Sequence, residues 1–352
     1  MSLQQSLSLL SAPGTRASRA LLGRRIAGLS ALAALALASP AWAAMPVCAN
    51  PITSCPCRII QAGASYVLTQ DLVTTGGGDC IRIAAPGVTL DLGSATITPS
   101  VQSPGSVGVH VMSGARDTVV QGSPDAPAMV QFFSTGIQVD ARGVTLKNLS
   151  GQSNEVGILI QAGAAYGNTL SAVDNTRVGI LVRNVSSGPL LDNIAVSNTF
   201  GPGIKFNNVQ GGALVNVTAT ANHTYGVWLR ASSHNLLADF TASQNTTAGV
   251  YLGCFSNGGQ LSGTCDPSVP PSNSNLVAGL ATPSRVFGPT APSQRYGVVV
   301  GKGNSGNRVV DVIGSSNGVA DGADYNLECG SDLWRDNQFA VTIPAGIDTC
   351  IR

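Results

Sequence analysis

A short tetrad, Gly-[Ile/Val]-x-[Val/Ile/Leu/Phe], recurs along the chain and constrains its fold more than any other feature. The tetrads begin at Gly108, Gly136, Gly157, Gly179, Gly203, Gly226, Gly249 and Gly297. From Gly136 to Gly249 they are spaced by 21 to 24 residues, and the last gap of 48 residues equals two such periods. The two apolar residues of each tetrad stand on either side of a variable residue, which is the period of a half-buried β-strand. Self-similarity at this period predicts a repeat protein.

A second pair of apolar residues, three positions apart, recurs with the tetrads. The pairs are Leu146/Leu149, Leu170/Val173, Leu191/Ile194, Leu214/Val217, Leu237/Phe240, Val277/Leu280 and Val309/Val312. The residues just before the second member are Asn148, Ala172, Asn193, Asn216, Asp239, Gly279 and Asp311. Because Asn, Asp and Gly tolerate a left-handed backbone, this position predicts a sharp corner between two short strands. We expect Asn193 and Asn216 to lie on adjacent coils, with their side chains stacked and largely buried.

Three short strands in each period of about 23 residues cannot bury an apolar face alone, but stacked coils bury it continuously. A leucine-rich repeat has a similar period, but its L-x-x-L-x-L consensus is missing here. The sequence therefore predicts an all-β fold, a single-stranded right-handed parallel β-helix. This solenoid would have about ten coils, and disulfide-tied caps would cover the strand edges at its two ends.

The first 43 residues have the pattern of an export signal. Four arginines precede an apolar run from Ile26 to Ala38, and the triplet Ala41-Trp42-Ala43 supplies a cleavage site. The run of 13 residues is too short to cross a bilayer about 30 Å thick. We expect a secreted or periplasmic protein that begins near Ala44 and has no membrane span. The predicted parts are a signal peptide (1–43), an N-terminal cap (44–80), a β-helix (81–328) with an insertion at about 254–295, and a C-terminal cap (329–352).

All eight cysteines follow the predicted signal, and an even number in an exported chain indicates disulfides. Proximity in the sequence favours the pairs Cys254–Cys265 and Cys329–Cys350. The other four, which are Cys48, Cys55, Cys57 and Cys80, allow three different connectivities.

Charge argues against nucleic acid as a partner. Without residues 1–43 the chain keeps 15 basic and 18 acidic residues, a net charge of about −3. Binding to a phosphate backbone requires a basic excess, which is missing here.

Three further segments carry a resemblance to a known family. They are S-Y-V-L-T-Q-D-L at 65–72, G-V-T-L-D-L at 87–92 and W-R-D-N-Q-F at 334–339. With the tetrads, they resemble the bacterial right-handed parallel β-helix repeat proteins of the pectate-lyase-like superfold, over about residues 52–352. That superfold includes pectate lyases, polygalacturonases, alginate epimerases, phage tailspikes and members without known activity. The resemblance implies the fold and leaves the function open.

Sequence motifs that carry catalysis in these relatives are missing. The N-T-D, D-D and G-H-G motifs of the polygalacturonase-like hydrolases do not occur. The segment 225–230, nearest to the Y-G-x-D-P-H of alginate epimerases, lacks the acid and the histidine. Calcium-binding carboxylates do not cluster either. We expect no metal and no cofactor, and we interpret His110, His223 and His234 as solvated surface residues.

The outward residues of the tetrad strands are the candidate site. If the second and fourth tetrad residues point into the core, the third and fifth point outward. The third positions are His110, Gln138, Leu159, Leu181, Lys205, Trp228, Tyr251 and Val299, and the fifth are Met112, Asp140, Gln161, Arg183, Asn207, Arg230, Gly253 and Gly301. The predicted substrate-binding residues are Asp140, Arg183, Lys205, Asn207, Trp228, Arg230 and Tyr251. Exposed aromatic rings would stack on sugars, and arginines would pair with uronate carboxylates.

Three functions fit these features. An exported protein that binds an anionic polysaccharide without catalysis is the first, because the acid pair of a glycoside hydrolase is missing. The alternative is a polysaccharide lyase on a uronate-containing polymer, in which a lysine or arginine of strongly lowered pKa acts as the base. A surface adhesin or scaffold is the third. We expect a monomer and leave open whether it is an enzyme.

Overall fold

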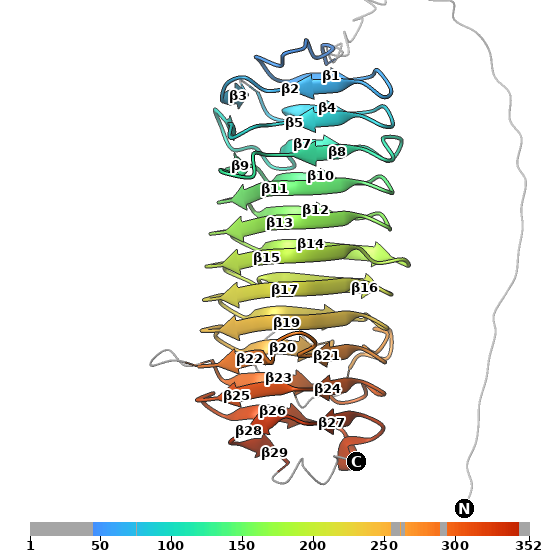
Figure 1. Cartoon of the computed structure of the whole chain (residues 1–352), viewed down its shortest axis with the longest axis vertical. Coiled ribbons are helices and arrows are strands. Elements are labelled where there is room, and N and C mark those ends of the chain that lie inside the picture. The colour runs from blue at the N-terminus through green and yellow to red at the C-terminus, as the bar shows by residue number, and fades with distance from the viewer. Residues whose placement is uncertain (1–44, 75, 255–260, 262–264, 289–293, 345–352) are drawn as a thin grey trace, which may run out of the picture. The chain divides into compact units, whose positions relative to one another are not determined.

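The computed structural model describes residues 45–74, 76–254, 261, 265–288 and 294–344. The predicted signal peptide (1–43), Ala44 and residues 345–352 of the predicted C-terminal cap lie outside the described residues. Strands form the regular structure of the described part, together with one short 3-10 helix, η1 (Leu327–Cys329). Figure 1 shows the strands stacked coil upon coil from β1 to β29. Neighbouring coils pair in parallel, as the repeat predicts for a β-solenoid.

One wall of the solenoid is sheet A, which contains 12 described strands. They are β1 (Cys57–Ile59), β4 (Ile81–Ile83), β7 (Val107–Val111), β10 (Thr135–Val139), β12 (Val156–Ile160), β14 (Val178–Val185), β16 (Ile204–Val209), β18 (Tyr225–Arg230), β20 (Ala248–Leu252), β23 (Tyr296–Val300), β26 (Ala320–Asp324) and β29 (Thr342–Ile343). Each of the eight tetrads lies in or at the start of one of these strands. The predicted register is present, since Leu181 pairs with Lys205 and Trp228 pairs with Tyr251.

The remaining walls form sheet B, in which each coil bends between two arms. Its strands are β2 (Ser65–Val67), β3 (Leu72–Thr74), β5 (Thr89–Asp91), β6 (Thr96–Pro99), β8 (Val119–Gln121), β9 (Ala128–Gln131), β11 (Thr145–Gln152), β13 (Tyr166–Val173), β15 (Leu190–Ser197), β17 (Ala213–Thr220), β19 (Leu236–Ser243), β21 (Leu276–Ala278), β22 (Ser284–Phe287), β24 (Arg308–Val310), β25 (Val312–Ser315), β27 (Leu333–Arg335) and β28 (Gln338–Phe339). Central coils supply one bent strand of eight residues, whereas coils nearer the ends supply two short strands. The bend divides sheet B into two walls. Together with sheet A, each coil therefore has three walls and a closed cross-section.

The coil after β20 is longer than the repeat predicts. β20 pairs directly with β23, so the 48 residues from Gly249 to Gly297 form one enlarged coil and not two periods. Residues 276–278 and 284–287 of the predicted insertion supply β21 and β22 of sheet B. The enlargement therefore precedes β21, in the segment that contains Cys254 and Cys265.

The predicted left-handed corners are present at five of the seven positions, in the bends of sheet B. Asn148, Asn193, Asn216, Asp239 and Asp311 all have φ between 52° and 60°. In the coil of β13 the corner lies at Thr169, directly before Leu170, and Ala172 follows it by three residues.

The side chains of Asn193 and Asn216 are exposed, so the predicted buried stack of these two residues is wrong. The two residues do lie on adjacent coils. Their amides reach toward the preceding coil, Asn193 to Thr169 and Asn216 to Asp192. A bend that turns the backbone around the core directs its side chain toward water, and for this reason the corner asparagines cannot stack inside.

The buried amide ladder lies at another turn, just before sheet A. Its members are fully buried and stand three or four residues ahead of a tetrad glycine. They are Asn154, Asn175, Asn222 and Asn245. Each side chain accepts a hydrogen bond from the backbone of the preceding coil, as Asn222 Oδ1 does from Thr199 N at 3.2 Å. A Cβ at Gly203 would lie 2.8 Å from Asn222 Nδ2. The tetrad glycine is therefore required because Val196, the ladder amide and the carbonyl of Gly226 in the next coil occupy the space where its side chain would point.

Disulfides tie the start of the solenoid and the enlarged coil. Of the three connectivities that the sequence left open, the structure has Cys48–Cys57 and Cys55–Cys80. The predicted pair Cys254–Cys265 is confirmed. Cys329 is disulfide-bonded, and its predicted partner Cys350 lies outside the described residues.

Candidate functional site

A polar network covers the outward face of the first coils of sheet A. His110 lies between two carboxylates, with Nδ1 2.8 Å from Asp79 Oδ2 and Nε2 2.8 Å from Asp140 Oδ2. Arg82 also contacts Asp79, and its Nε donates to Oδ2 at 2.9 Å. Two carboxylates thus face one imidazole and one guanidinium. With the imidazole protonated, these four groups balance one another in charge.

The register of three coils assembles this network. His110 is the third residue of its tetrad in β7, Asp140 directly follows β10, and Gln138 of β10 pairs with His110. Asp79 directly precedes Cys80, whose disulfide to Cys55 anchors the neighbouring turn. Strand pairing and a covalent bond therefore fix the positions of the three charged groups.

Contacts within the network shift the pKa values of its members. Burial opposes protonation of His110, but the hydrogen bonds to Asp140 and Asp79 outweigh it and raise the pKa of the imidazole to about 9. Burial likewise opposes ionisation of the two carboxyls, yet the contact with His110 lowers the pKa of both Asp79 and Asp140. At neutral pH the network therefore contains an imidazolium and two carboxylates.

Asp140 connects the network by hydrogen bonds to the following coils. Its Oδ2 also accepts from Gln138 Nε2 at 2.9 Å, and its Oδ1 accepts from Gln161 Nε2 at 2.9 Å. The carbonyl of Gln161 then accepts from Arg183 Nε at 2.7 Å. Asp140, Gln161 and Arg183 occupy fifth positions on three consecutive coils, so the predicted outward row is present. A carboxylate that accepts three hydrogen bonds and has a lowered pKa is poorly suited to donate or remove a proton near neutral pH.

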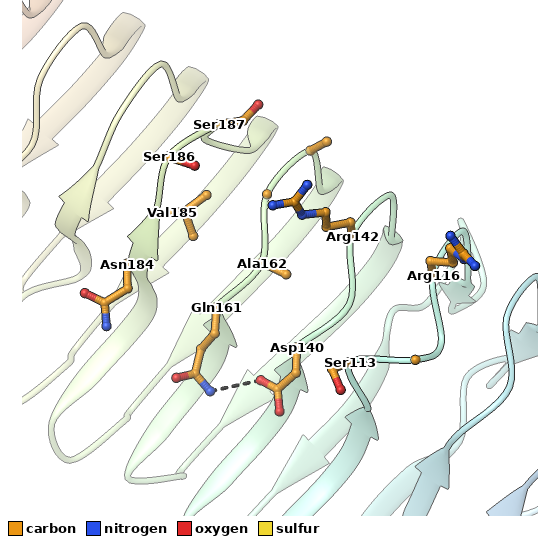
Figure 2. Close-up of a pocket in the computed structure, with 13 residues that line it drawn as sticks. Ser113, Arg116, Asp140, Arg142, Gln161, Ala162, Asn184, Val185, Ser186 and Ser187 are labelled. Carbon is orange, nitrogen blue, oxygen red and sulfur yellow. Dashed lines mark hydrogen bonds between the residues drawn. The ribbon is translucent and has the colours of Figure 1, made fainter.

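A cavity opens beside this row, at the carboxyl ends of β7, β10, β12 and β14. It has a volume of about 630 Å³, within the range of small-molecule sites. Its lining comprises Ser113, Gly114, Arg116, Asp140, Arg142, Gln161, Ala162, Gly163, Ala164, Asn184, Val185, Ser186 and Ser187. Figure 2 shows Asp140 and Gln161 hydrogen-bonded at one side of the cavity, with Arg142 and Arg116 on the turns beside it. Both arginines are exposed, and neither forms an ion pair with a described residue.

The remaining predicted residues form a second group around Lys205. Its Nζ lies 3.9 Å from the centroid of the Trp228 ring, a cation–π contact. Arg230 donates to Asn207 Oδ1 at 2.8 Å and to the carbonyl of Cys254. Burial, followed by the charges of Arg230 and Arg177, lowers the pKa of Lys205 to about 8.

The prediction that the aromatic side chains are exposed is wrong. Trp228 is 2% exposed and Tyr251 is fully buried. They pack with Tyr225, Val299 and Leu261 into a second apolar cluster outside the solenoid core, and Trp228 Nε1 donates to the carbonyl of Gly253 at 2.7 Å. Leu261 belongs to the segment that the Cys254–Cys265 disulfide closes. The rings do point outward, but the enlarged coil covers them.

Comparison with known proteins identifies the fold. Residues 96–258 match the family described as periplasmic copper-binding protein (NosD). The Dettilon tailspike protein superposes with a TM-score of 0.57 at 12% identity, over 80% of this chain and 61% of the tailspike. The A-module of mannuronan C-5 epimerase AlgE4 from Azotobacter vinelandii superposes with a TM-score of 0.55 at 11% identity, over 80% of each chain. The chain is a right-handed parallel β-helix repeat protein. It spans less than two thirds of the tailspike, and no curated protein matches it.

The described residues of this β-helix protein do not fit a copper site. No three His, Cys, Asp or Glu side chains among them converge as metal ligands would. Their cysteines are all in disulfides, and both nitrogens of His110 face carboxylates. Copper in proteins takes imidazole and sulfur ligands, which these side chains do not supply together. In the same part of the chain, no helix is long and apolar enough to cross a membrane.

Sequence reasoning missed several residues of the site. The network also needs Asp79, Arg82 and His110, and the cavity needs Arg116 and Arg142. His110 is paired with carboxylates in the structure, so its interpretation as a solvated residue is wrong. One signal was available, because His110 and Asp140 both belong to the predicted outward ladders of neighbouring coils. Asp79 gave no such signal, since it lies ahead of a strand without a tetrad.

Proposed function

We propose that this β-helix protein is exported and binds an acidic polysaccharide on the outward face of sheet A, in the cavity beside β7 to β14. The single observation that carries the proposal is the charge of the cavity. Asp140 is compensated by His110, whereas Arg116 and Arg142 have no ion-pair partner among the described residues. Two uncompensated guanidinium groups suit the carboxylates of a uronate polymer.

The polar lining supports sugar as the ligand class. Ser113, Ser186 and Ser187 present hydroxyl groups from turns around the cavity, and Asn184, near the end of β14, presents an amide. Hydroxyl and amide groups pair with sugar hydroxyls in either direction, as donor or acceptor. Mannuronan, the polymer named for the AlgE4 module, is such an acidic chain and agrees with this ligand class.

Arginine removal provides the test. We expect oligomers of alginate or polygalacturonate to bind. We expect the double variant Arg116→Ala/Arg142→Ala to weaken binding by about a hundredfold, because each of the two charged hydrogen bonds contributes about 1.5 kcal/mol. Isothermal titration calorimetry measures the effect. Arg285→Ala/Arg308→Ala is the matched control, since it removes the same charge from exposed positions of sheet B. An equal loss in the control, or equal binding of a neutral dextran, would contradict the proposal.

A uronate lyase is the second candidate, and Lys205 favours it. A lysine whose pKa is about 8 is partly neutral near physiological pH and can act as a general base. In the elimination, the base removes the proton at C5, the electron pair forms the C4–C5 double bond, and the C4–oxygen bond breaks as that oxygen gains a proton.

Product formation tests the second candidate. Ultraviolet absorbance of the unsaturated product should rise with time, and the rate should increase as the pH passes through about 8, because only the neutral amine accepts a proton. Lys205→Gln should abolish turnover while oligouronate binding persists. If the wild-type protein forms no unsaturated product, the lyase candidate is wrong and only the binding function remains.

A further inference from the structure

Two aromatic rings stack in the turns ahead of β16 and β18. The centroids of Phe200 and His223 are 4.5 Å apart and the rings are inclined by 23°. Phe200 is 69% exposed, although a phenyl ring is ordinarily buried. The pair therefore presents an apolar, flat surface to the solvent.

The turns that hold the rings are fixed by hydrogen bonds between coils. Phe200 N donates to Asn175 O at 2.8 Å, and His223 N donates to Thr199 O at 2.9 Å. The amide ladder described above lies directly beneath, since Asn222 immediately precedes His223. The aromatic surface thus sits on a rigid support, so ordering it on binding has a small entropic cost.

The fold itself does not demand aromatic residues at this position. The equivalent position is Thr176 in the coil before Phe200 and Thr246 in the coil after His223. Both threonines form the same backbone hydrogen bond to the preceding coil. A small polar residue therefore satisfies the turn. An exposed phenyl ring here has no structural role that threonine does not fill.

Two basic residues lie in the turn and strand next to Phe200 along the coils. Arg177, in the turn before β14, is 65% exposed and is held by an ion pair with Glu155. Lys205, in the strand that follows Phe200, is near enough to Arg177 for their charges to interact. An apolar ring surface beside cations matches a pyranose that carries a carboxylate.

We propose that Phe200 and His223 form a second sugar subsite, which stacks on one pyranose ring of an acidic polysaccharide. The subsite rests on the function proposed above. Because the strands are parallel, it lies at the amino-terminal edge of sheet A, whereas the cavity lies at the carboxyl-terminal edge. A polysaccharide that occupies both crosses the face obliquely, past Arg183 and Lys205.

Phe200→Ala is the principal test, with alginate and polygalacturonate oligomers as the probes. We expect the Kd to rise about tenfold, with a melting temperature close to that of the wild type because the ring is exposed. Phe200→Tyr should retain the wild-type Kd, since it keeps the ring. Leu280→Ala is the matched control, because it removes an apolar side chain that is 62% exposed in the bend between β21 and β22.

Histidine resonances give a second, independent readout. The chain has three histidines, so their NMR signals can be assigned by substitution. Added oligouronate should shift the ring resonance of His223 and leave that of His234, which is exposed in the turn before β19, unchanged. Wild-type binding with an unmoved His223 and an unaltered Phe200→Ala affinity would overturn the subsite and leave the cavity proposal standing. No binding of either oligomer to the wild type would overturn both.

Discussion

Replacing Asn222 with leucine is expected to lower the free energy of unfolding by about 3–5 kcal/mol, because it breaks the buried amide ladder. The side chain is fully buried. Its Oδ1 accepts from Thr199 N, and its Nδ2 donates to Asn245 Oδ1 at 2.9 Å. Leucine would leave the backbone donor of Thr199 unpaired away from water and would press two methyl groups toward the tetrad glycine Gly203.

Asn216→Gly is the matched control for this substitution. It also removes an asparagine amide, but one that is exposed and bonded only to Asp192. Glycine tolerates the left-handed φ of 52° at that corner, so the expected change is below about 1 kcal/mol. Denaturant unfolding monitored by circular dichroism compares the two variants. Equal effects would show that the ladder contributes no more than an exposed corner.

The contrast between these asparagines shows how far the sequence could predict the fold. Period and alternation were enough to give the parallel solenoid and the register of sheet A, because a shift by one residue would bury Arg183 and Arg230. The left-handed corners followed from backbone preference alone, as at Asn193. Which asparagines are buried did not follow, because that depends on the direction in which each turn points its side chain. The spacing of Asn222 and Asn245 four residues ahead of tetrad glycines is the signal that identifies the ladder.

The candidate site was predicted in part, for a similar reason. The outward row of Asp140 and Arg183 needed only the repeat, so its positions were correct. The burial of Trp228 and Tyr251 was not predictable from the repeat, because the covering segment belongs to the enlarged coil, which has no periodicity. Because Leu261 packs against these rings, a ligand cannot stack on Trp228, and the proposed site is the arginine-lined cavity instead.

The stability conferred by His110 is expected to depend on pH, with a loss of about 3 kcal/mol between pH 6.5 and 9. The pKa of this imidazole rises from 6.5 to about 9 on folding, and its side chain is only 16% exposed. A shift of this size corresponds to about 3 kcal/mol at most. Because the folded pKa is the higher one, the stabilisation is complete below pH 6.5 and disappears as the pH rises through 9. The lowered pKa values of Asp79 and Asp140 have the opposite effect on stability. The stabilisation from these carboxylates is present above their ordinary pKa of 3.8 and is lost as the pH falls below it.

Comparison of His110→Gln with the wild type isolates this effect from other groups that titrate in the same range. Lys205 and Asp332, whose pKa values are lowered to about 8 and raised to about 7, are present in both proteins and cancel in the difference. We expect the variant to be less stable by about 3 kcal/mol at pH 6 and to approach the wild type at pH 10. His234→Asn is the control, because it removes an exposed imidazole and asparagine suits the left-handed φ of 58° at that position. If the difference between His110→Gln and the wild type stays constant from pH 6 to pH 10, the imidazole is not the charged bridge between Asp79 and Asp140.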